Sequence, residues 1–207
     1  MDTAVAFVQA YLHINGYFTV TEYPVVEAMK HGGFRTATDL DVLAVRFPGA
    51  GRLVATHGKA SRDIRFEPDP ALDGEETLPP GTVDMIIGEV KEGRAELNRG
   101  ARDPVVLRTV LTRFGCCPEE HVAPVVEDLL RRGRALMPSG HRARLVAFGT
   151  STGEPLGYPC EVMSLGHVIE FTRGYLREHW DVLRQAQFKD TAISVLMMLE
   201  KTKGALS

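Results

Sequence analysis

The sequence predicts an α/β fold in which a mixed central β-sheet is flanked by α-helices. Three observations predict it. Residues 2–14 have the apolar spacing of an amphipathic helix, three strand-like segments follow, and helix-like and strand-like segments then share the rest of the chain. Its 207 residues suffice for one domain with a proper core. We therefore expect a single domain over residues 1–207.

The first half of the chain is expected to supply one helix and three strands. Gly16 follows the opening helix where a helix should stop. Residues 17–26 are rich in Thr, Val and aromatic side chains, which favours a strand, and residues 30–33 then supply a turn. The second strand is expected at 39–47 and the third at 83–91, where a short apolar run suits a buried central position.

Between the second and third strands we expect a long insertion at about 49–82. This segment holds many Gly, Pro and acidic residues and has no sustained hydrophobic period.

The second half is expected to alternate helices and strands and to end in a helical C-terminal extension at about 166–204. Asp103 is a good N-cap, Pro104 suits the first helical position, and Gly115 ends that helix. The remaining expected elements are a helix at 118–132, strands at 144–149 and 161–165, a helix continuing to about 184, and a last helix at 190–201.

The composition is that of an ordinary globular protein, with 44% hydrophobic and 25% charged residues. A net charge of -3 argues against a protein that coats nucleic acid by bulk attraction. The N-terminus lacks the basic region of a secretory signal, no apolar run is long enough to span a membrane, and three cysteines point to reduced thiols. We expect a cytoplasmic protein with no membrane partner.

A candidate site lies on the second and third strands. Side chains alternate along a strand, so Glu89 and Lys91 share one face while Val90 points to the other, and Asp41 shares a face with Asp39. If the two strands pair, Asp41 and Glu89 can come within the ~4.5 to 5.5 Å Cβ separation of facing residues. Two carboxylates and a lysine would then converge.

A divalent cation would relieve the repulsion between two carboxylates held close together. Mg²⁺, or Mn²⁺ in its place, prefers oxygen ligands and commonly binds one or two carboxylates plus phosphate oxygens of a substrate. Lys91 would orient the attacking water or stabilise negative charge that develops on the phosphate. The predicted chemistry is hydrolysis of a phosphodiester.

The segments TDLDVLAVR (38–46) and DMIIGEVKEG (84–93) resemble the active-site hairpin of the PD-(D/E)XK nuclease superfamily, which includes restriction endonucleases and repair nucleases. The resemblance covers roughly residues 1–100. It implies a restriction endonuclease-like core, a metal held by Asp41, Glu89 and the Val90 carbonyl, and a catalytic Lys91. It also implies nucleic acid as the substrate, with DNA as the first candidate, and leaves room for a homodimer or a partner protein.

The chain departs from the family pattern in its first helix. Many members carry a Glu there, whereas this helix offers only Asp2 and Gln9. Glu22 on the first strand is a candidate for that role, against the alternative of simple exposure. Asp39 is a second supporting candidate, against the alternative of a residue that only starts a strand or turn.

Five arginines, with no acid among them, are a candidate surface for a nucleic-acid backbone, although solvated helix ends are the commoner explanation. They are Arg131, Arg132, Arg134, Arg142 and Arg144.

Two readings of function remain open. The first is a metal-dependent nuclease that uses Asp41, Glu89 and Lys91. The alternative is a catalytically inactive nuclease-fold module that binds nucleic acid or a protein partner, because a fold does not determine a function. For Glu89 and Lys91 themselves, the alternative to a catalytic role is a solvated pair at the end of a strand.

Overall fold

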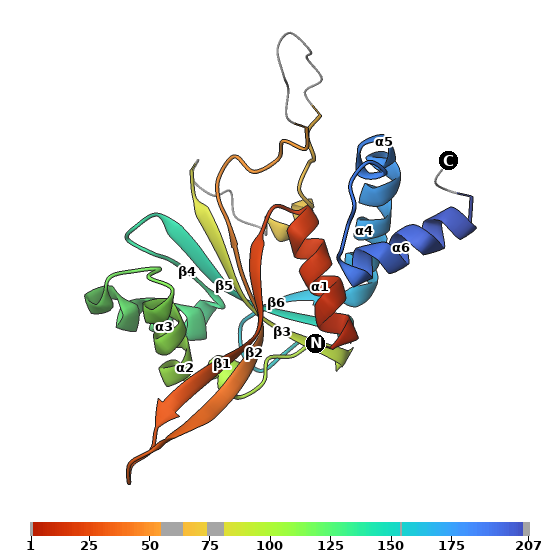
Figure 1. The fold of residues 1–207 in the computed structure, drawn as a ribbon. Helices are drawn as coiled ribbons and strands as arrows, with labels where there is room; N and C mark the ends of the chain where they lie inside the picture. The colour runs from red at the N-terminus through yellow and green to blue at the C-terminus, as the bar shows by residue number, and fades with distance from the viewer. Residues whose placement is uncertain (1, 55–63, 74–80, 154, 205–207) are drawn as a thin grey trace.

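A six-stranded sheet runs through the part of the chain that the structure, a computed structural model, describes: residues 2–54, 64–73, 81–153 and 155–204. The strand order is β1-β2-β3-β5-β4, and β6 pairs with β5 on the same side as β4 (Figure 1). The strands are β1 (Phe18–Ala28), β2 (Phe34–Arg46), β3 (Val83–Arg94), β4 (Arg134–Leu136), β5 (His141–Ser151) and β6 (Glu161–Ser164).

The sheet is mixed, as the sequence predicted. Strands β1, β2 and β3 form an antiparallel meander, whereas β3 and β5 are parallel. Because a parallel pair cannot be joined by a tight turn, the chain between β3 and β5 makes a crossover that contains α2 (Pro104–Arg113) and α3 (Glu119–Arg132).

Helices cover both faces of the sheet. Leu43 and Ile87 contribute to a core with side chains of α2 and α3. On the other face, Val42 and Ile86 contribute to a core with α1 (Thr3–Ile14) and α4 (Leu165–Glu178). This alternation along β2 and β3 explains why both strands are so apolar: each is buried on two sides.

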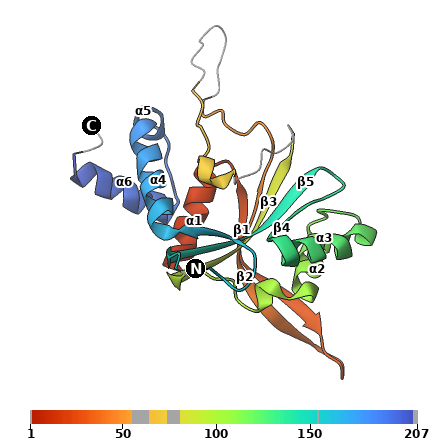
Figure 2. The same ribbon diagram turned by 180° about the vertical axis from the view of Figure 1, so that it is seen from behind.

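A third core lies outside the sheet, between α1, α4 and the last helix, α6 (Thr191–Thr202). The short α5 (Trp180–Leu183) precedes α6, and Leu183 is buried in the same core. Figure 2 shows α4, α5 and α6 together at one end of the molecule, with α2 and α3 at the other.

Side-chain caps start most of the longer helices. The Asp103 carboxylate accepts from the Val105 N–H at 2.8 Å and Pro104 opens α2, as the sequence predicted. Asp2, Ser164 and Asp190 cap α1, α4 and α6 in the same way.

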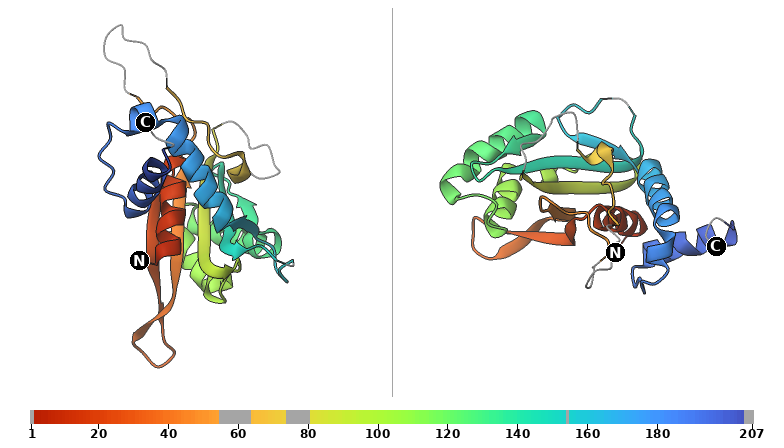
Figure 3. Two further views of the ribbon diagram at one scale, coloured as in Figure 1. Left: turned by 90° about the vertical axis from the view of Figure 1, so that its right-hand side faces the viewer. Right: turned by 90° about the horizontal axis from the view of Figure 1, so that it is seen from above.

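The three largest differences from the predicted elements concern β2, α4 and β4. Strand β2 begins at Phe34 rather than 39, because β1 pairs with it as far as the turn and forms a hairpin that projects from the molecule (Figure 3). The helix expected up to 184 is divided at His179 into α4 and α5. Strand β4 was not expected, since its three residues are too few for a periodic signal.

The described part of the expected insertion at 49–82 is anchored to α1. It contains the 3₁₀ helix η1 (Pro70–Leu72), and Leu72 is fully buried in the core beside α1. Asp69 accepts a hydrogen bond from the Tyr11 hydroxyl at 2.7 Å, and its N–H donates to Asn15 Oδ1. The other parts of this insertion, residues 55–63 and 74–80, lie outside the described residues.

None of the helices in the described ranges has the length and apolar character needed to cross a bilayer. The three cysteines, Cys116, Cys117 and Cys160, are free thiols.

Candidate active site

The pairing of β2 with β3 brings Asp41 and Glu89 together. In the antiparallel register Val42 faces Gly88 and Leu43 faces Ile87, so Asp41 and Glu89 come next on the two strands. Both side chains lie on the face that carries Leu43 and Ile87, because residues two apart on a strand point the same way. The site is therefore on the side of the sheet covered by α2 and α3.

Asp41, Glu89 and Lys91 form one cluster of charges. The Lys91 Nζ lies 3.4 Å from Glu89 Oε2 and 3.7 Å from Asp41 Oδ2. Asp41 Oδ2 also accepts a hydrogen bond from the backbone N–H of Val90 at 2.8 Å, which ties the two strands together at the site. The three residues singled out from the sequence are thus neighbours in space.

Glu89 is the buried member of this cluster. Its side chain is fully buried, whereas those of Asp41 and Lys91 are 23% and 39% exposed. Burial and then the nearby charge of Asp41 raise the pKa of Glu89 to about 7, and the Lys91 ammonium opposes that rise. A carboxyl group in this state changes its charge near neutral pH, which is unusual for a glutamate.

The two oxygens of Glu89 have different surroundings. Oε2 accepts a hydrogen bond from Asn98 Nδ2 at 2.7 Å and contacts Lys91. Oε1 is buried, and none of the described residues gives it a hydrogen bond. A buried carboxylate oxygen without a partner is costly, so a cationic ligand at this oxygen would stabilise it.

Glu22 lies on β1 beside Asp41. Thr21 pairs with Val42 and Tyr23 with Leu40, so Glu22 is level with Asp41 in the β1–β2 ladder. Its φ of 52° is the only positive φ among the described non-glycine residues, and its side chain is exposed. The register brings Glu22 next to the site.

Among the described residues, Asp39, Asp2 and Gln9 form no hydrogen bond or ion pair with Asp41, Glu89 or Lys91. Asp39 is an exposed residue within β2, opposite Pro24, and so it neither starts the strand nor lies in a turn. Asp2 caps α1, and Gln9 donates to Thr19 Oγ1. Val90 presents its side chain to the core on the α1 side of the sheet and its N–H to Asp41.

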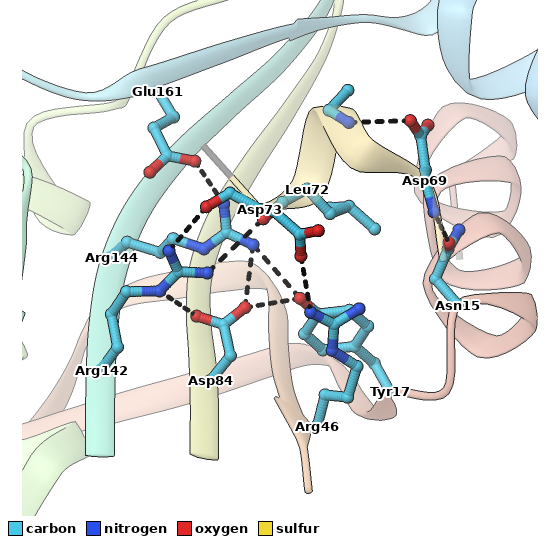
Figure 4. Close-up of polar contacts among 11 residues, drawn as sticks. Asn15, Tyr17, Arg46, Asp69, Leu72, Asp73, Asp84, Arg142, Arg144 and Glu161 are labelled. Carbon is cyan, nitrogen blue, oxygen red and sulfur yellow. Dashed lines mark hydrogen bonds and ion pairs between the residues drawn. The ribbon is translucent and has the colours of Figure 1, made fainter. Parts of the chain in front are cut away.

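The expected arginine surface is wrong for two of its five members. Arg142 and Arg144 are only 4% and 1% exposed, and both form ion pairs with the buried Asp84 (Figure 4). Arg144 also contacts Glu161 and the Tyr17 hydroxyl. These guanidinium groups hold β3, β5 and β6 together and cannot contact a nucleic acid.

The other three arginines are more accessible. Arg131 and Arg132, at the end of α3, are exposed beside Asp128. Arg134, at the start of β4, is half-buried. Arg142 and Arg144 differ from these three because they lie in β5, whose residues are buried on both faces.

Sequence reasoning missed Asn98. This residue follows β3 and, besides its bond to Glu89, its Oδ1 accepts from the Ala101 N–H at 2.6 Å at the start of η2 (Gly100–Arg102). The sequence carries one signal for the second contact, an Asn two residues before a short helical turn. It carries none for the first, which depends on how the chain turns back after β3.

Comparison with protein-family models, with curated proteins and with solved structures gives no match.

The donor atoms at this site suit a hard cation. Among the described residues no group of three or more His, Cys, Asp and Glu side chains is arranged to hold a metal. The pair of Asp41 and Glu89 nevertheless offers carboxylate oxygens only, and Mg²⁺ commonly binds proteins through one or two carboxylates. The unpartnered Oε1 of Glu89 fits the same ligand.

Proposed function

We propose that this protein is a metal-dependent nuclease of the PD-(D/E)XK type, which hydrolyses phosphodiester bonds of a nucleic acid at Asp41, Glu89 and Lys91. One observation carries the proposal: two carboxylates and an ammonium group converge where β2 and β3 meet, and one of the carboxylates is buried with an unpartnered oxygen. Strongly perturbed carboxyl groups of this kind are concentrated at functional sites.

The order of the elements supports the proposal. A helix precedes three antiparallel strands, and a helical crossover then leads to a strand parallel to β3. The acids and the lysine lie on the second and third strands of that meander, as the resemblance implies. Fold alone does not determine activity, so the main support for this activity is the arrangement of the Asp41, Glu89 and Lys91 side chains.

Asp41 and Glu89 would hold one Mg²⁺ or Mn²⁺. The Val90 N–H keeps the Asp41 carboxylate turned towards β3 at 2.8 Å. When bound, the cation would polarise a phosphate oxygen and lower the pKa of a water ligand. Lys91 Nζ stands within 4 Å of Asp41 Oδ2 and Glu89 Oε2, and its flexible side chain allows the ammonium to turn from them towards a substrate.

Lys91 is the residue that acts on the substrate. Its ammonium is the most exposed charge of the three and can donate to a phosphate oxygen or to the attacking water. Donation to the phosphate stabilises the negative charge that develops as the phosphorus is attacked. The Glu89 carboxylate cannot bind a substrate phosphate directly, because it is fully buried and its negative charge would repel the phosphate.

The substrate proposed is nucleic acid, with DNA first. Arg142 and Arg144 are buried and cannot contact a substrate. The phosphates of the nucleic acid would therefore be bound by Lys91, by the cation and by the exposed arginines that remain. A chain with a net charge of -3 should bind such a polymer weakly away from the site.

Calorimetric titration of the full chain with MnCl₂ tests the metal site, and incubation with single-stranded, duplex and branched DNA and with RNA tests cleavage. We expect Asp41→Asn and Glu89→Gln to abolish Mn²⁺ binding and cleavage. Lys91→Met should retain Mn²⁺ binding and lose cleavage, because it removes only the group that acts on the substrate.

Glu92→Gln is the matched control. It removes a carboxylate from the exposed end of the same strand and should behave as the unaltered protein does. A protein that binds no Mn²⁺ and cleaves none of these substrates would contradict the proposal and favour a module that binds without catalysis.

A further inference from the structure

Asn98, which is not one of the three residues proposed to carry the reaction, donates a hydrogen bond to the Glu89 carboxylate. Its Nδ2 lies 2.7 Å from Glu89 Oε2, and Lys91 Nζ lies 3.4 Å from the same oxygen. Both donors therefore contact one oxygen of Glu89, and the described residues leave the other oxygen, Oε1, without a hydrogen bond.

The orientation of the Asn98 amide is determined by its other contacts. Oδ1 accepts from the Ala101 N–H at 2.6 Å, so the carboxamide must present its NH₂ group to Glu89. The reverse orientation would place two oxygens against each other at Glu89 and two N–H donors against each other at Ala101.

The backbone around Asn98 is also held. The Tyr158 hydroxyl accepts from the Leu97 N–H at 2.8 Å and lies 3.2 Å from the Leu97 carbonyl oxygen, while the Leu97 side chain is 3% exposed in the core. The guanidinium of Arg102 stacks on the Tyr158 ring at 3.9 Å and donates to the Asn98 carbonyl. Asn98 is thus presented to Glu89 by a rigid turn and not by a loose loop.

We propose that Asn98 is a positioning residue for the metal site: it holds Oε2 of Glu89 and thereby presents Oε1 as the single Glu89 oxygen that binds the cation. The inference rests on the proposed function, because it assigns a role within that site. Partners that hold a ligating carboxylate in this way typically change metal affinity by roughly 10- to 100-fold when they are removed.

The division between oxygens extends to Asp41. Its Oδ2 accepts from the Val90 N–H and lies beside Lys91 Nζ, and among the described residues neither a hydrogen bond nor an ion pair involves Oδ1. Asn98 and the Val90 N–H therefore play matching parts, each holding one oxygen of a carboxylate so that the second oxygen is the ligand.

Asn98→Ser is the variant that isolates this role. Serine retains an acceptor for the Ala101 N–H, since it is a good capping residue, but it is too short to reach Glu89. The matched control is Asp103→Ser, which makes the corresponding change at the cap of α2, where the side chain accepts from the Val105 N–H. Circular dichroism and thermal denaturation establish that both variants fold.

Titration with MnCl₂ is the first measurement. We expect Asn98→Ser to bind Mn²⁺ roughly 10- to 100-fold more weakly and Asp103→Ser to bind it as the unaltered protein does. If the unaltered protein binds Mn²⁺ and Asn98→Ser binds it equally well, the positioning role is refuted while the proposed function stands. If the unaltered protein binds no Mn²⁺, the proposed function itself fails.

The side-chain amide signals of Asn98 in ¹H–¹⁵N spectra supply a readout that a purely structural cap would not move. They should shift in Glu89→Ala, which removes the acceptor, and should persist at a bonded position in protein saturated with Mg²⁺. If Mg²⁺ instead moves these signals to the chemical shift of a solvated amide, Asn98 no longer donates to Glu89 Oε2. That result would overturn the assignment of Oε1 as the single Glu89 ligand.

Discussion

Glu89→Gln should make the metal-free protein more stable, and increasingly so as the pH rises. The Glu89 carboxyl has an ordinary pKa of 4.5 when unfolded, and burial next to Asp41 raises the pKa to about 7 in the folded protein. Between these values the folded state binds more protons than the unfolded state. The free energy of unfolding therefore falls with rising pH across this interval and levels off above it.

The size of the effect follows from the same two values. Each pH unit between them corresponds to about 1.4 kcal/mol, so the ionised Glu89 costs the folded protein about 3 kcal/mol at pH 8 but only about 1 kcal/mol at pH 5. Glutamine has nearly the same shape and does not titrate. The stability gained by Glu89→Gln should thus be larger at pH 8 than at pH 5 by about 2 kcal/mol.

Urea denaturation in the presence of a chelator, at several pH values from 5 to 8, measures this difference. Glu92→Gln, at an exposed position of the same strand, should shift the free energy of unfolding by less than about 0.5 kcal/mol throughout. A gain for Glu89→Gln that does not grow with pH would refute the reasoning, because it would mean that Glu89 is not held ionised against its surroundings. Excess Mg²⁺ should stabilise the unaltered protein at pH 8 and leave Glu89→Gln unchanged.

Three further substitutions test the architecture around the site. Gly149→Ala should lower the free energy of unfolding by about 1 to 3 kcal/mol in urea denaturation, because a Cβ at Gly149 would lie 2.4 Å from the backbone nitrogen of Ala95. Asp84→Ala should cost about 3 to 5 kcal/mol by leaving two buried guanidinium groups without their carboxylate. If that variant still folds, Mn²⁺ titration should show an intact site, since Asp84 lies roughly 16 Å from Glu89 along β3. Glu22→Gly should raise the free energy of unfolding by up to about 1 kcal/mol, because φ is positive at Glu22. Glu27→Gly, at an ordinary strand position, should lower it.

Most of the elements could be predicted because they follow local rules. The helix from Pro104 is marked by the Asp103 cap, and β3 is marked by its short apolar run. The length of β2 could not be predicted. Its outer residues, from Phe34 to Thr38, have no buried apolar face of their own, and they are extended because β1 pairs with them.

The predicted site residues illustrate the same limit. Strand alternation was enough to place Glu89 and Lys91 on one face, because it depends only on the geometry of the backbone. Whether an arginine is exposed depends on what packs against its strand. Arg142 and Arg144 follow three other arginines in the sequence with no acid between them, yet both are buried against Asp84.

The sequence by itself determined that two carboxylates and a lysine would share one face of neighbouring strands, and that helices would flank the sheet. Only the tertiary structure decided their environment: Glu89 is fully buried, Asn98 reaches one of its oxygens, and the other is left without a partner. The physical reason is that the alternation of side chains along a strand depends only on the local backbone. Burial and hydrogen bonding depend on segments such as 95–102, whose path relative to β3 is set by packing far along the chain.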